Sequence, residues 1–477
     1  MIDFIRDQPF VRELQSRGAD IYFVGGCVRD QILGRPTKDV DLLVRRLYVD
    51  TLCNVLDKYG SANVVGTDLR CAIKFVPSGC ELPEPLDITI PRYETSTGEG
   101  HRDFKIELDP EGAVEEDLAR RDFTMNALAM PVEGGDLIDP HGGMTDIKTR
   151  MIRVLHARSF EHDPLRMLRG VRFRTQLDPQ GFTLSGNTAT LMRDHAHLIR
   201  HVSAERVAEE LVRILRAPKP SIGFYEMRSY GLLTHVLPEV QALTGVKQPN
   251  KHHLYDAFDH VMVVLDAARS DAALQNPGDM NLMLSALCHD LGKPSTYTED
   301  PETGAIHFHS HQVVSRDLTR RIFERIPFHA VKGANVDPAT VARNARLHMD
   351  LMVEPEDRDS MSPRAMRRLI VRAGGPQGIQ SLIDLRIADK RGGARPNNIG
   401  FILEFREFVR NFIETKPAFS VRDLAVDGND VMEVFGIKPS RRVGEVLNAL
   451  FERVTDEGLP NEREALLAVL RELKEEP

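Results

Sequence analysis

The sequence predicts an α/β domain with a mixed sheet at the N-terminus, followed by mostly α-helical domains. Two observations support this prediction. In the first 150 residues, short apolar segments such as IYFV (21–24) and LDITI (86–90) are separated by glycine, proline and threonine, as is typical of strands joined by turns. From residue 151 onward, apolar side chains recur at helical spacing, for example at Leu165, Leu168 and Val171.

The chain of 477 residues is long enough for several domains of roughly 100–200 residues each. A net charge of -9 argues against a generally basic protein that coats nucleic acid, but it is compatible with an enzyme that acts on nucleic acid. We expect four domains: an α/β head at 1–150, a helical neck and body at 151–240, a His-rich helical domain at 241–395 and a helical tail at 396–477.

Cysteine usage and the absence of targeting signals favour the cytoplasm. The five cysteines are scattered and form no Cys-x-x-Cys pair, so we expect neither a disulfide framework nor a cysteine zinc site. The N-terminal MIDFIRDQPF has no basic stretch followed by an apolar core, and no apolar run approaches about 18 residues. We therefore expect no signal peptide, no membrane span and a cytoplasmic location.

A glycine pair after the first predicted strand fits a phosphate-binding turn. Gly25 and Gly26 follow IYFV, and two glycines let the backbone approach a triphosphate closely. The helix expected next would offer unpaired N–H groups, and Arg29 could add charge-assisted hydrogen bonds to phosphate oxygens. Taken alone, the pair is more typical of an ordinary glycine turn.

Two aspartates follow at strand spacing. Asp39 and Asp41 would point to the same face of a strand, because strand side chains alternate. Two carboxylates so placed repel each other unless a cation lies between them. The expected cation is Mg²⁺, which one or two carboxylates and substrate phosphates commonly hold. The alternative for an isolated Asp-x-Asp is a solvated strand edge.

The order of these pieces resembles a known family. A glycine pair, a helix and Asp-x-Asp on the next strand are similar to nucleotidyltransferases of the polymerase β superfamily. GGCVRDQILG (25–34) with DVD (39–41) resembles class II tRNA nucleotidyltransferases and bacterial poly(A) polymerases, and RRDFTMNAL (120–128) and HDPLRMLR (162–169) match two further motifs of that family. The resemblance covers most of the chain and implies a polymerase β-like head.

The resemblance implies roles for individual residues. Asp39 and Asp41 would be the catalytic pair that binds two Mg²⁺ ions, which position the 3′-hydroxyl of an RNA primer and the α-phosphate of the incoming nucleotide. Asp87, in LDITI, is a candidate third carboxylate. The residues expected to contact the nucleotide are Gly25, Gly26, Arg29, Arg121, Asp122, Asn126, Asp163, Arg166 and Arg169.

The third motif would read the base. In the family, Asp163 and Arg166 would offer an acceptor and a fork of donors to the Watson–Crick edges of C and A, so that the protein serves as the template. Their spacing of three allows one shared helix face, although Asp163 before Pro164 also fits a plain helix start. His162 stands where the family usually has Glu, a residue that orients the Arg in relatives.

A polar stretch, GEGHRD (98–103), lies where CCA-adding and A-adding relatives carry a loop. Enzymes that add only CC tend to lack this loop. Its presence therefore argues against a CC-only enzyme, and the alternative reading is a solvated hairpin.

A second constellation lies in the helical middle of the chain. An adjacent His-Asp pair on an apolar helix, as in LMLSALCHDLGK, would be costly to bury without partners and suits a divalent ion. The series resembles the HD phosphohydrolase superfamily, which implies hydrolysis of a phosphoester by water that a metal activates. The matching ligands of this unidentified divalent metal are His260, His289, Asp290 and Asp389, with His311 and His348 as extra ligands of the two-metal type.

The segment GIKPSRRVG (436–444) resembles the C-terminal part of the family, which contacts the tRNA body. Lys438, Arg441 and Arg442 are therefore RNA-binding candidates, and the alternative is a packed helical cap.

The leading interpretation is a CCA tRNA nucleotidyltransferase. It would add C, C and A to the tRNA 3′ end from CTP and ATP without a nucleic-acid template, release pyrophosphate, and carry an additional HD phosphohydrolase site. An A-adding tRNA nucleotidyltransferase and a poly(A) polymerase share all three motifs and stay open. A further alternative is an HD phosphohydrolase with a non-catalytic RNA-binding head, against which the intact Asp39, Asp41, Asp163 and Arg166 argue. The oligomeric state is not readable from the sequence.

Overall fold

The computed structural model describes residues 1–37, 39–65, 72–79, 82, 84–96, 104–249, 255–351, 361–414, 419–456 and 459–475. The chain divides into two compact units: Met1–Ile214 with Ile222–Val236, and Leu215–Ser221 with Leu237–Pro477. The predicted loop at 98–103 lies outside the described residues. Among the helices that are described, none is long and apolar enough to cross a membrane.

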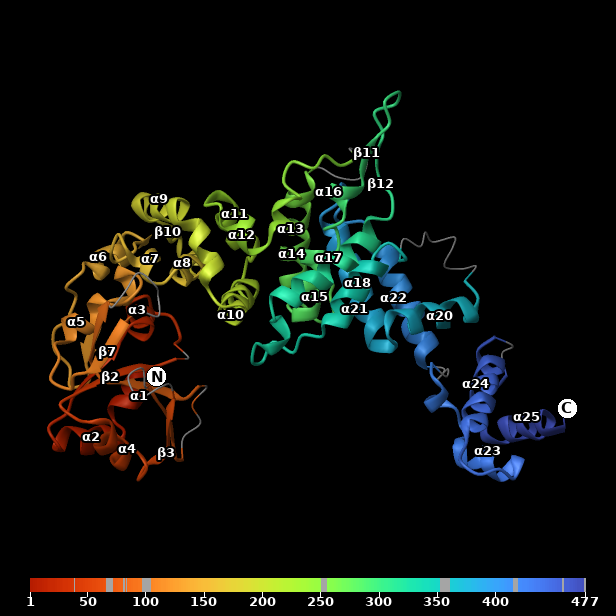
Figure 1. Ribbon diagram of the computed structural model, residues 1–477, viewed down its shortest axis with the longest axis horizontal. Helices are drawn as coiled ribbons and strands as arrows, with labels where there is room; N and C mark the ends of the chain where they lie inside the picture. Colours follow the sequence, from red (N-terminus) through yellow and green to blue (C-terminus); the bar gives the residue numbers. More distant parts are fainter. Residues whose placement is uncertain are drawn as a thin grey trace. The chain divides into compact units, whose positions relative to one another are not determined.

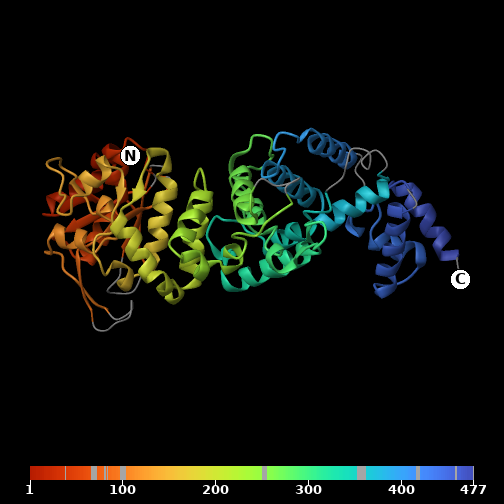
Figure 2. The ribbon, with the colours of Figure 1, turned by 90° about the horizontal axis from the view of Figure 1, so that it is seen from above.

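A six-stranded mixed sheet lies at the centre of the first unit, in the order β3-β4-β5-β2-β1-β8. Neighbouring strands are antiparallel except β2 and β5, which run parallel. Figures 1 and 2 show this sheet in the red and orange part of the chain. Its strands are β1 (Asp20–Val24), β2 (Asp41–Arg45), β3 (Gly60–Val65), β4 (Ala72–Pro77), β5 (Leu86–Thr89) and β8 (Ala129–Pro131).

Helices cover the sheet because its strands alternate in burial and leave an apolar face to be packed. The rings of Phe10 on α2 and Phe75 on β4 lie 5.0 Å apart in an edge-to-face contact, and both are buried. The remaining elements of this part are α1 (Ile2–Arg6), α2 (Pro9–Ser16), α3 (Gly26–Ile32), α4 (Val49–Leu56), α5 (Val114–Ala119), η1 (Thr124–Asn126), α6 (Gly143–Lys148) and the hairpin of β6 (Arg92–Ser96) and β7 (Phe104–Leu108).

The second half of the first unit is helical apart from one short parallel strand pair, β9 (Met151–Ile152) with β10 (Thr183–Leu184). A buried ion pair joins two of its helices, because Arg172 Nε on α8 lies 2.8 Å from Glu210 Oε2 on α10. The helices are α7 (Ser159–His162), α8 (Leu165–Gln176), η2 (Asp178–Gln180), α9 (Gly186–His195), η3 (Ala196–His201), α10 (Ala204–Leu215), α11 (Ser221–Ser229) and α12 (Leu232–Val236).

The first part of the second unit is a helical bundle in which α14 packs on α15 and α21, and α17 packs on α18. The hairpin of β11 (Tyr297–Glu299) and β12 (Ile306–Phe308) projects from these helices in Figure 1. The helices are α13 (Pro238–Gln241), α14 (Ala257–Ser270), α15 (Met280–Cys288), α16 (Lys293–Thr296), α17 (His311–Arg325), η4 (Phe328–Ala330), α18 (Pro338–Leu347), α20 (Pro363–Ala373) and α21 (Pro376–Arg391).

The C-terminal helices, blue in Figure 1, have a hydrophobic core of their own that includes Val431, Leu450 and Leu466. The fold class predicted from the sequence, an α/β head followed by mostly helical domains, is confirmed. Among the described residues, the strand pairs β9–β10 and β11–β12 are additions, because both lie in regions expected to be helical. The last helices are α22 (Gly400–Glu414), η5 (Val421–Asp423), α23 (Gly428–Phe435), α24 (Arg441–Asp456) and α25 (Arg463–Glu475).

Candidate active sites

The turn after β1 brings three predicted site residues together. Gly25 has a positive φ of 78°, which favours glycine. A Cβ at this position would lie 2.4 Å from Arg121 Nη1 and 3.3 Å from Asp41 Oδ2. Glycine is therefore required for both its conformation and the close approach of Arg121. The Nε of Arg121 is buried and has no hydrogen-bond partner in the part of the chain that the structure describes.

The carboxylates gather at the adjoining strand ends. Asp41 begins β2, pairs across the sheet with Val24 of β1 and lies beside Asp87 of β5 in the parallel register. Burial raises the pKa of Asp41 to about 6; the charge of Arg121 opposes this rise, whereas Asp87 and Asp39 add to it. Asp39 is exposed two residues earlier. The arrangement is one that a cation would stabilise.

Asp87 has a partner that sequence reasoning missed. Lys74 Nζ on β4 donates to Asp87 Oδ2 at 2.6 Å, and the two residues are paired directly across antiparallel strands. The row Lys74, Asp87 and Asp41 thus crosses three neighbouring strands. A lysine in the middle of a six-residue strand carries no sequence signal for this contact, because only the strand register places it.

Four predicted nucleotide contacts form one hydrogen-bonded network. Arg29 Nη1 donates to Asn126 Oδ1 at 2.7 Å, and Asn126 Nδ2 donates to Asp122 Oδ1 at 3.0 Å. The other oxygen of Asp122 accepts from Arg169 Nε at 2.7 Å. Burial alone would raise the pKa of Asp122, but Arg169 and Asn126 hold it well below its usual range. The network fixes the relative positions of α3, η1 and α8.

A buried carboxylate outside the motifs holds the neighbouring arginines. Asp117 on α5 is 1% exposed and accepts from Arg120 through one oxygen and from Arg121 through the other, the latter at 3.4 Å. The sequence places Asp117 in an acidic first helical turn, which is typical of a solvated helix start. Its burial, and hence its role in orienting Arg121, depends on tertiary packing.

Asp163 and Arg166 are oriented by separate partners. Asp163 Oδ2 accepts from Arg206 Nη2 on α10 at 2.9 Å, and Oδ1 accepts from the backbone N–H of Leu165 at 3.2 Å. Arg166 Nη2 donates to the carbonyl of Arg120 at 2.7 Å. Arg206 was missed from the sequence, where an arginine on an amphipathic helix is typical of the solvent face.

His162 is an exposed side chain at the end of α7. Desolvation and the positive charges of Arg158 and Arg166 lower the pKa of His162. The acceptors of Arg166 include the Arg120 carbonyl at 2.7 Å and the hydroxyl of Ser159 at 3.4 Å. These neutral acceptors help to orient its guanidinium.

The six predicted metal ligands converge in the second unit. Two groups have ligand atoms within 4.8 Å of one another, and five of the six residues are buried. His260 comes from the first turns of α14, His289 and Asp290 follow α15, His311 begins α17, His348 follows α18, and Asp389 lies in the last turn of α21. The first group is His260, His289 and Asp389, and the second is Asp290, His311 and His348.

Asp290 belongs to the second group and also faces the first. Its Oδ2 is 3.1 Å from His289 Nε2, and its Oδ1 is 3.4 Å from His311 Nε2. Lys293 Nζ is 2.6 Å from the same Oδ2 and donates to Gln248 Oε1 at 2.6 Å. Burial alone would raise the pKa of Asp290, but His289 and Lys293 hold it well below its ordinary value.

Backbone carbonyls fix the orientation of all four imidazoles. Each Nδ1 faces a carbonyl oxygen, so the tautomer that satisfies these contacts donates from Nδ1 and leaves the Nε2 lone pair toward the centre. The donor set of neutral imidazoles and carboxylates fits a divalent transition metal. The carbonyls belong to Gly392 for His260 (3.1 Å), Ala286 for His289 (2.9 Å), Phe308 for His311 (2.8 Å) and Ala345 for His348 (2.8 Å).

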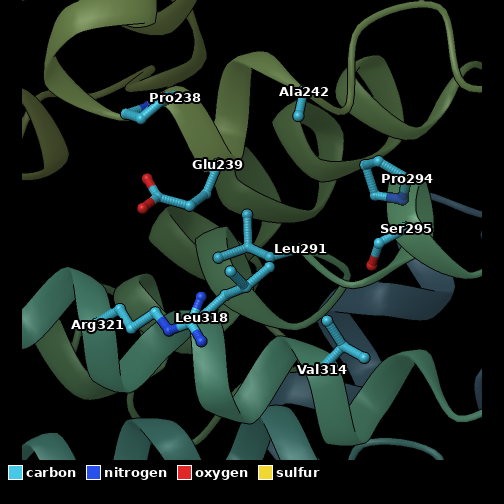
Figure 3. Close-up of a pocket in the computed structure, with 9 residues that line it drawn as sticks. All are labelled: Pro238, Glu239, Ala242, Leu291, Pro294, Ser295, Val314, Leu318 and Arg321. Carbon is cyan, nitrogen blue, oxygen red and sulfur yellow. The ribbon is translucent and has the colours of Figure 1, made fainter.

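Other features of this region lie apart from the metal groups. His307 and His309 are exposed and stacked with ring centroids 5.3 Å apart, and His329 is exposed in η4. A mostly apolar hollow of about 450 Å³ has Glu239 and Arg321 among its lining residues. Figure 3 shows the residues that line it. None of the six converging ligands lines this hollow.

The predicted RNA-binding residues of the tail are all exposed. Lys438 lies before α24, and Arg441 and Arg442 begin it. Arg441 Nε is 3.2 Å from Glu445 one turn on, which leaves most of its surface accessible. The three cations lie within five residues at one helix start.

Comparisons with known proteins agree with this geometry. Residues 21–153 match the poly A polymerase head domain, 181–243 an RNA- and SrmB-binding site of polymerase A, 258–391 the HD domain, and 409–470 tRNA nucleotidyltransferase domain 2.

Relatives match over most of their length. The chain is 32% identical over 444 residues to the multifunctional CCA protein of Xanthomonas campestris pv. campestris. The aligned region covers 90% of this chain and 98% of the relative. It is 34% identical over 398 residues to the A-adding tRNA nucleotidyltransferase of Deinococcus radiodurans, with 80% and 85% covered. The crystal structure of the Bacillus stearothermophilus CCA-adding enzyme in complex with CTP matches with a TM-score of 0.64 and 25% identity, over 99% of this chain and 98% of that one.

Proposed function

The chain belongs to the CCA-adding tRNA nucleotidyltransferase family, and on that premise we propose that it adds C, C and A in turn to the tRNA 3′ end from CTP and ATP. The observation that carries the proposal is the convergence of Asp41 and Arg121 on the side of Gly25 that a Cβ would fill. A match over 98% of the multifunctional CCA protein supports addition of all three nucleotides over addition of A alone.

The turn and its arginines would hold the triphosphate. Because Gly25 has no side chain, the guanidinium of Arg121 lies directly against the turn and near Asp41, where it would donate to a phosphate oxygen. Asp117 holds that guanidinium from behind at 3.4 Å. Through Asn126, Arg29 ties this turn to the Asp122–Arg169 pair, so the parts of the nucleotide pocket are linked before substrate arrives.

Asp39 and Asp41 would hold Mg²⁺. The residues fit the ion, because the pKa of Asp41 is raised to about 6 by burial with carboxylates beside it, and a hard cation relieves both costs. When bound, two magnesium ions would supply charge stabilisation as the primer 3′-hydroxyl displaces pyrophosphate from the α-phosphate. Asp87 beside Asp41 would be a third carboxylate in the same row.

Asp163 and Arg166 would select the base. Asp163 presents an acceptor held by Arg206, and Arg166 presents donors held by the Arg120 carbonyl. Because both side chains have protein partners, they are oriented in the absence of nucleotide, which is what a protein template requires. Exposed Lys438, Arg441 and Arg442 would contact the phosphate backbone of tRNA farther from its end.

The experiment that tests this function uses three tRNA substrates, one lacking CCA, one ending in CC and one complete. Each is incubated with CTP, ATP or both, and the products are sequenced. The proposal predicts completion of the first two and no extension of the third. Extension of only the CC-ending substrate would establish an A-adding enzyme, and repeated A addition to the complete tRNA would establish a poly(A) polymerase.

The convergence of the six ligands supports a second activity, phosphoester hydrolysis, in the HD region. We infer that the HD region is a metal-dependent phosphohydrolase with two neighbouring metal positions, because Asp290 faces both groups and every imidazole turns its Nε2 inward. When bound, the metals would supply activated water and charge stabilisation for attack on a phosphoester. Hydrolysis of a 2′,3′-cyclic phosphate is measured with Mg²⁺, Mn²⁺, Co²⁺ and Ni²⁺, and absence of hydrolysis with all four would contradict this part.

A further inference from the structure

Both carboxylates among the six converging ligands, Asp290 and Asp389, are paired with a cation that lies three residues away in the chain. Lys293 lies three residues after Asp290, with Nζ 2.6 Å from Oδ2. Arg386 lies three residues before Asp389 on α21, with Nη1 2.7 Å from Oδ2. Lys293 has a second acceptor in Gln248. The role of Arg386 is less clear than that of Lys293, because Arg386 belongs to none of the sequence motifs.

The contact divides the two oxygens of Asp389 between different partners. Oδ2 accepts from Arg386, whereas Oδ1 is 3.1 Å from His260 Nε2 and 3.8 Å from His289 Nε2. Arg386 therefore holds the carboxylate with one oxygen directed at the imidazoles. The last turn of α21 also supplies the Gly392 carbonyl that faces His260 Nδ1, so one turn orients two ligands of the first group.

Arg386 contacts the most exposed ligand of the first group. The side chain of Asp389 is 15% exposed, compared with 1% for those of His260 and His289. Arg386 itself is 8% exposed, and its Nε is buried without a hydrogen-bond partner among the residues described. That Nε is not accessible from solvent, but the positive charge of the guanidinium beside Asp389 would favour an anion bound at this ligand.

The charge of Arg386 opposes metal binding taken alone. A divalent cation at Asp389 Oδ1 would share one carboxylate with a guanidinium, and two like charges this close in a mostly buried site repel strongly. A site that served only to hold metal would gain affinity from a neutral residue here. A phosphoryl oxygen bound next to the metal would reverse the balance, because it brings negative charge to both cations.

We propose that Arg386 is a positioning residue that couples metal binding to phosphate binding at the first metal group. Its contact with Oδ2 leaves Oδ1 of Asp389 facing the imidazoles, a placement that the amide N–H of a Gln could keep, and its charge would attract the phosphoryl group of the substrate. The inference rests on the proposed HD phosphohydrolase function and adds to it that the site takes metal and an anionic phosphoryl group as a set. Since coupling is reciprocal, phosphate must tighten metal binding by the same factor as metal tightens phosphate binding.

The test measures Mn²⁺ affinity of the full chain by isothermal titration calorimetry, with and without inorganic phosphate. The variants are Arg386→Gln, Arg386→Lys and the control Arg391→Gln. Arg391 lies on the same helix but bonds Asp271, at 2.6 Å, outside both metal groups. In wild type and in Arg391→Gln, phosphate should tighten Mn²⁺ binding roughly tenfold, a modest coupling between neighbouring sites.

Arg386→Gln should bind Mn²⁺ alone at least as tightly as wild type and should lose the effect of phosphate, whereas Arg386→Lys should keep that effect. Unchanged coupling in Arg386→Gln, or no phosphate effect in wild type that binds Mn²⁺, would overturn the inference. So would much weaker Mn²⁺ binding by a folded Arg386→Gln protein, because Arg386 would then serve the metal itself. Failure of wild type to bind Mn²⁺ would instead contradict the metal site of the proposed function.

Discussion

The head and the HD region assemble their sites in opposite ways. In the head, Asp39 is exposed, Asp41 is half-buried with a raised pKa, and Arg121 has an unpartnered Nε among the described residues, so the site is incomplete without ligands. In the HD region, the ligands are almost fully buried and each imidazole is fixed by a carbonyl.

This difference indicates how each site would obtain its metal. The head has few protein ligands and would take Mg²⁺ together with a nucleotide triphosphate, as is usual for this ion. The HD region has six converging ligands and would hold its metals with protein groups. The two proposed activities should therefore be lost through different substitutions.

The largest expected effect is that of Asp41→Asn on nucleotide addition. Loss of one negative charge at the proposed two-metal site should lower addition of CTP and ATP by on the order of 10³-fold, because metal stabilisation of the transition state is worth several kcal/mol. Binding of tRNA should change little, since it depends on phosphate contacts elsewhere. Activity within a few fold of wild type would show that Asp41 is not a metal ligand.

Gly25→Ala should have the next largest effect. The added Cβ would lie 2.4 Å from Arg121 Nη1, on a residue whose φ is 78°, so Arg121 or the turn must shift. A misplacement of about 1 Å can lower the rate roughly 10²-fold. The matched control is Gly34→Ala, which has a φ of 64° but nothing within 4 Å of its Cβ. Equal losses in the two variants would mean that backbone strain alone explains the effect.

Arg166→Ala should mainly damage the choice among nucleotides. Removal of a base-reading donor should cost about 1–3 kcal/mol of discrimination between C and U and between A and G. Competition between the correct and incorrect triphosphates measures this ratio directly. Arg158→Ala removes a nearby exposed arginine that pairs with Glu161 and serves as control. If the two variants select nucleotides equally well, Arg166 is structural.

The smallest expected effect is that of pH on Mg²⁺ use in the head. The pKa of Asp41 is raised from 3.8 to about 6, and only the ionised form binds the metal. The Mg²⁺ concentration for half-maximal nucleotide addition should therefore be nearly constant above pH 7 and rise about tenfold per unit below pH 6. A dependence that begins only near pH 4 would mean that burial does not raise this pKa.

Contiguous motifs made much of the molecule predictable from the sequence. The head fold, the helical remainder and the family were all predicted, because Gly25 and Gly26 lie a short helix away from Asp41. The expectation that Asp39 and Asp41 share one strand was met only for Asp41, because β2 begins at Asp41 and Asp39 precedes it. In the HD region, the adjacent His289 and Asp290 identified the relevant helix. Local pattern and resemblance were sufficient where the functional residues lie close together in the chain.

The supporting residues could not be predicted, because they come from distant segments. Arg206 reaches Asp163 across 43 residues, and Lys74 reaches Asp87 only through strand register. Arg386 and Asp117 lie on helices, where the sequence pattern does not distinguish them from charged residues on a solvent-exposed face. Both are buried, because other elements pack over them. Sequence pattern identified the groups that would touch substrate or metal, but it did not identify the groups that orient them.

The most direct test of the two-site account measures both activities on the same preparations of wild type, Asp41→Asn and a His289→Ala, Asp290→Ala double variant. Circular dichroism confirms folding, CTP and ATP incorporation reports on the head, and metal-dependent hydrolysis of a 2′,3′-cyclic phosphate reports on the HD region. The account predicts that Asp41→Asn loses only incorporation and that the double variant loses only hydrolysis. Loss of incorporation together with hydrolysis in a well-folded double variant would contradict it, because the HD region would then be part of the transferase machinery.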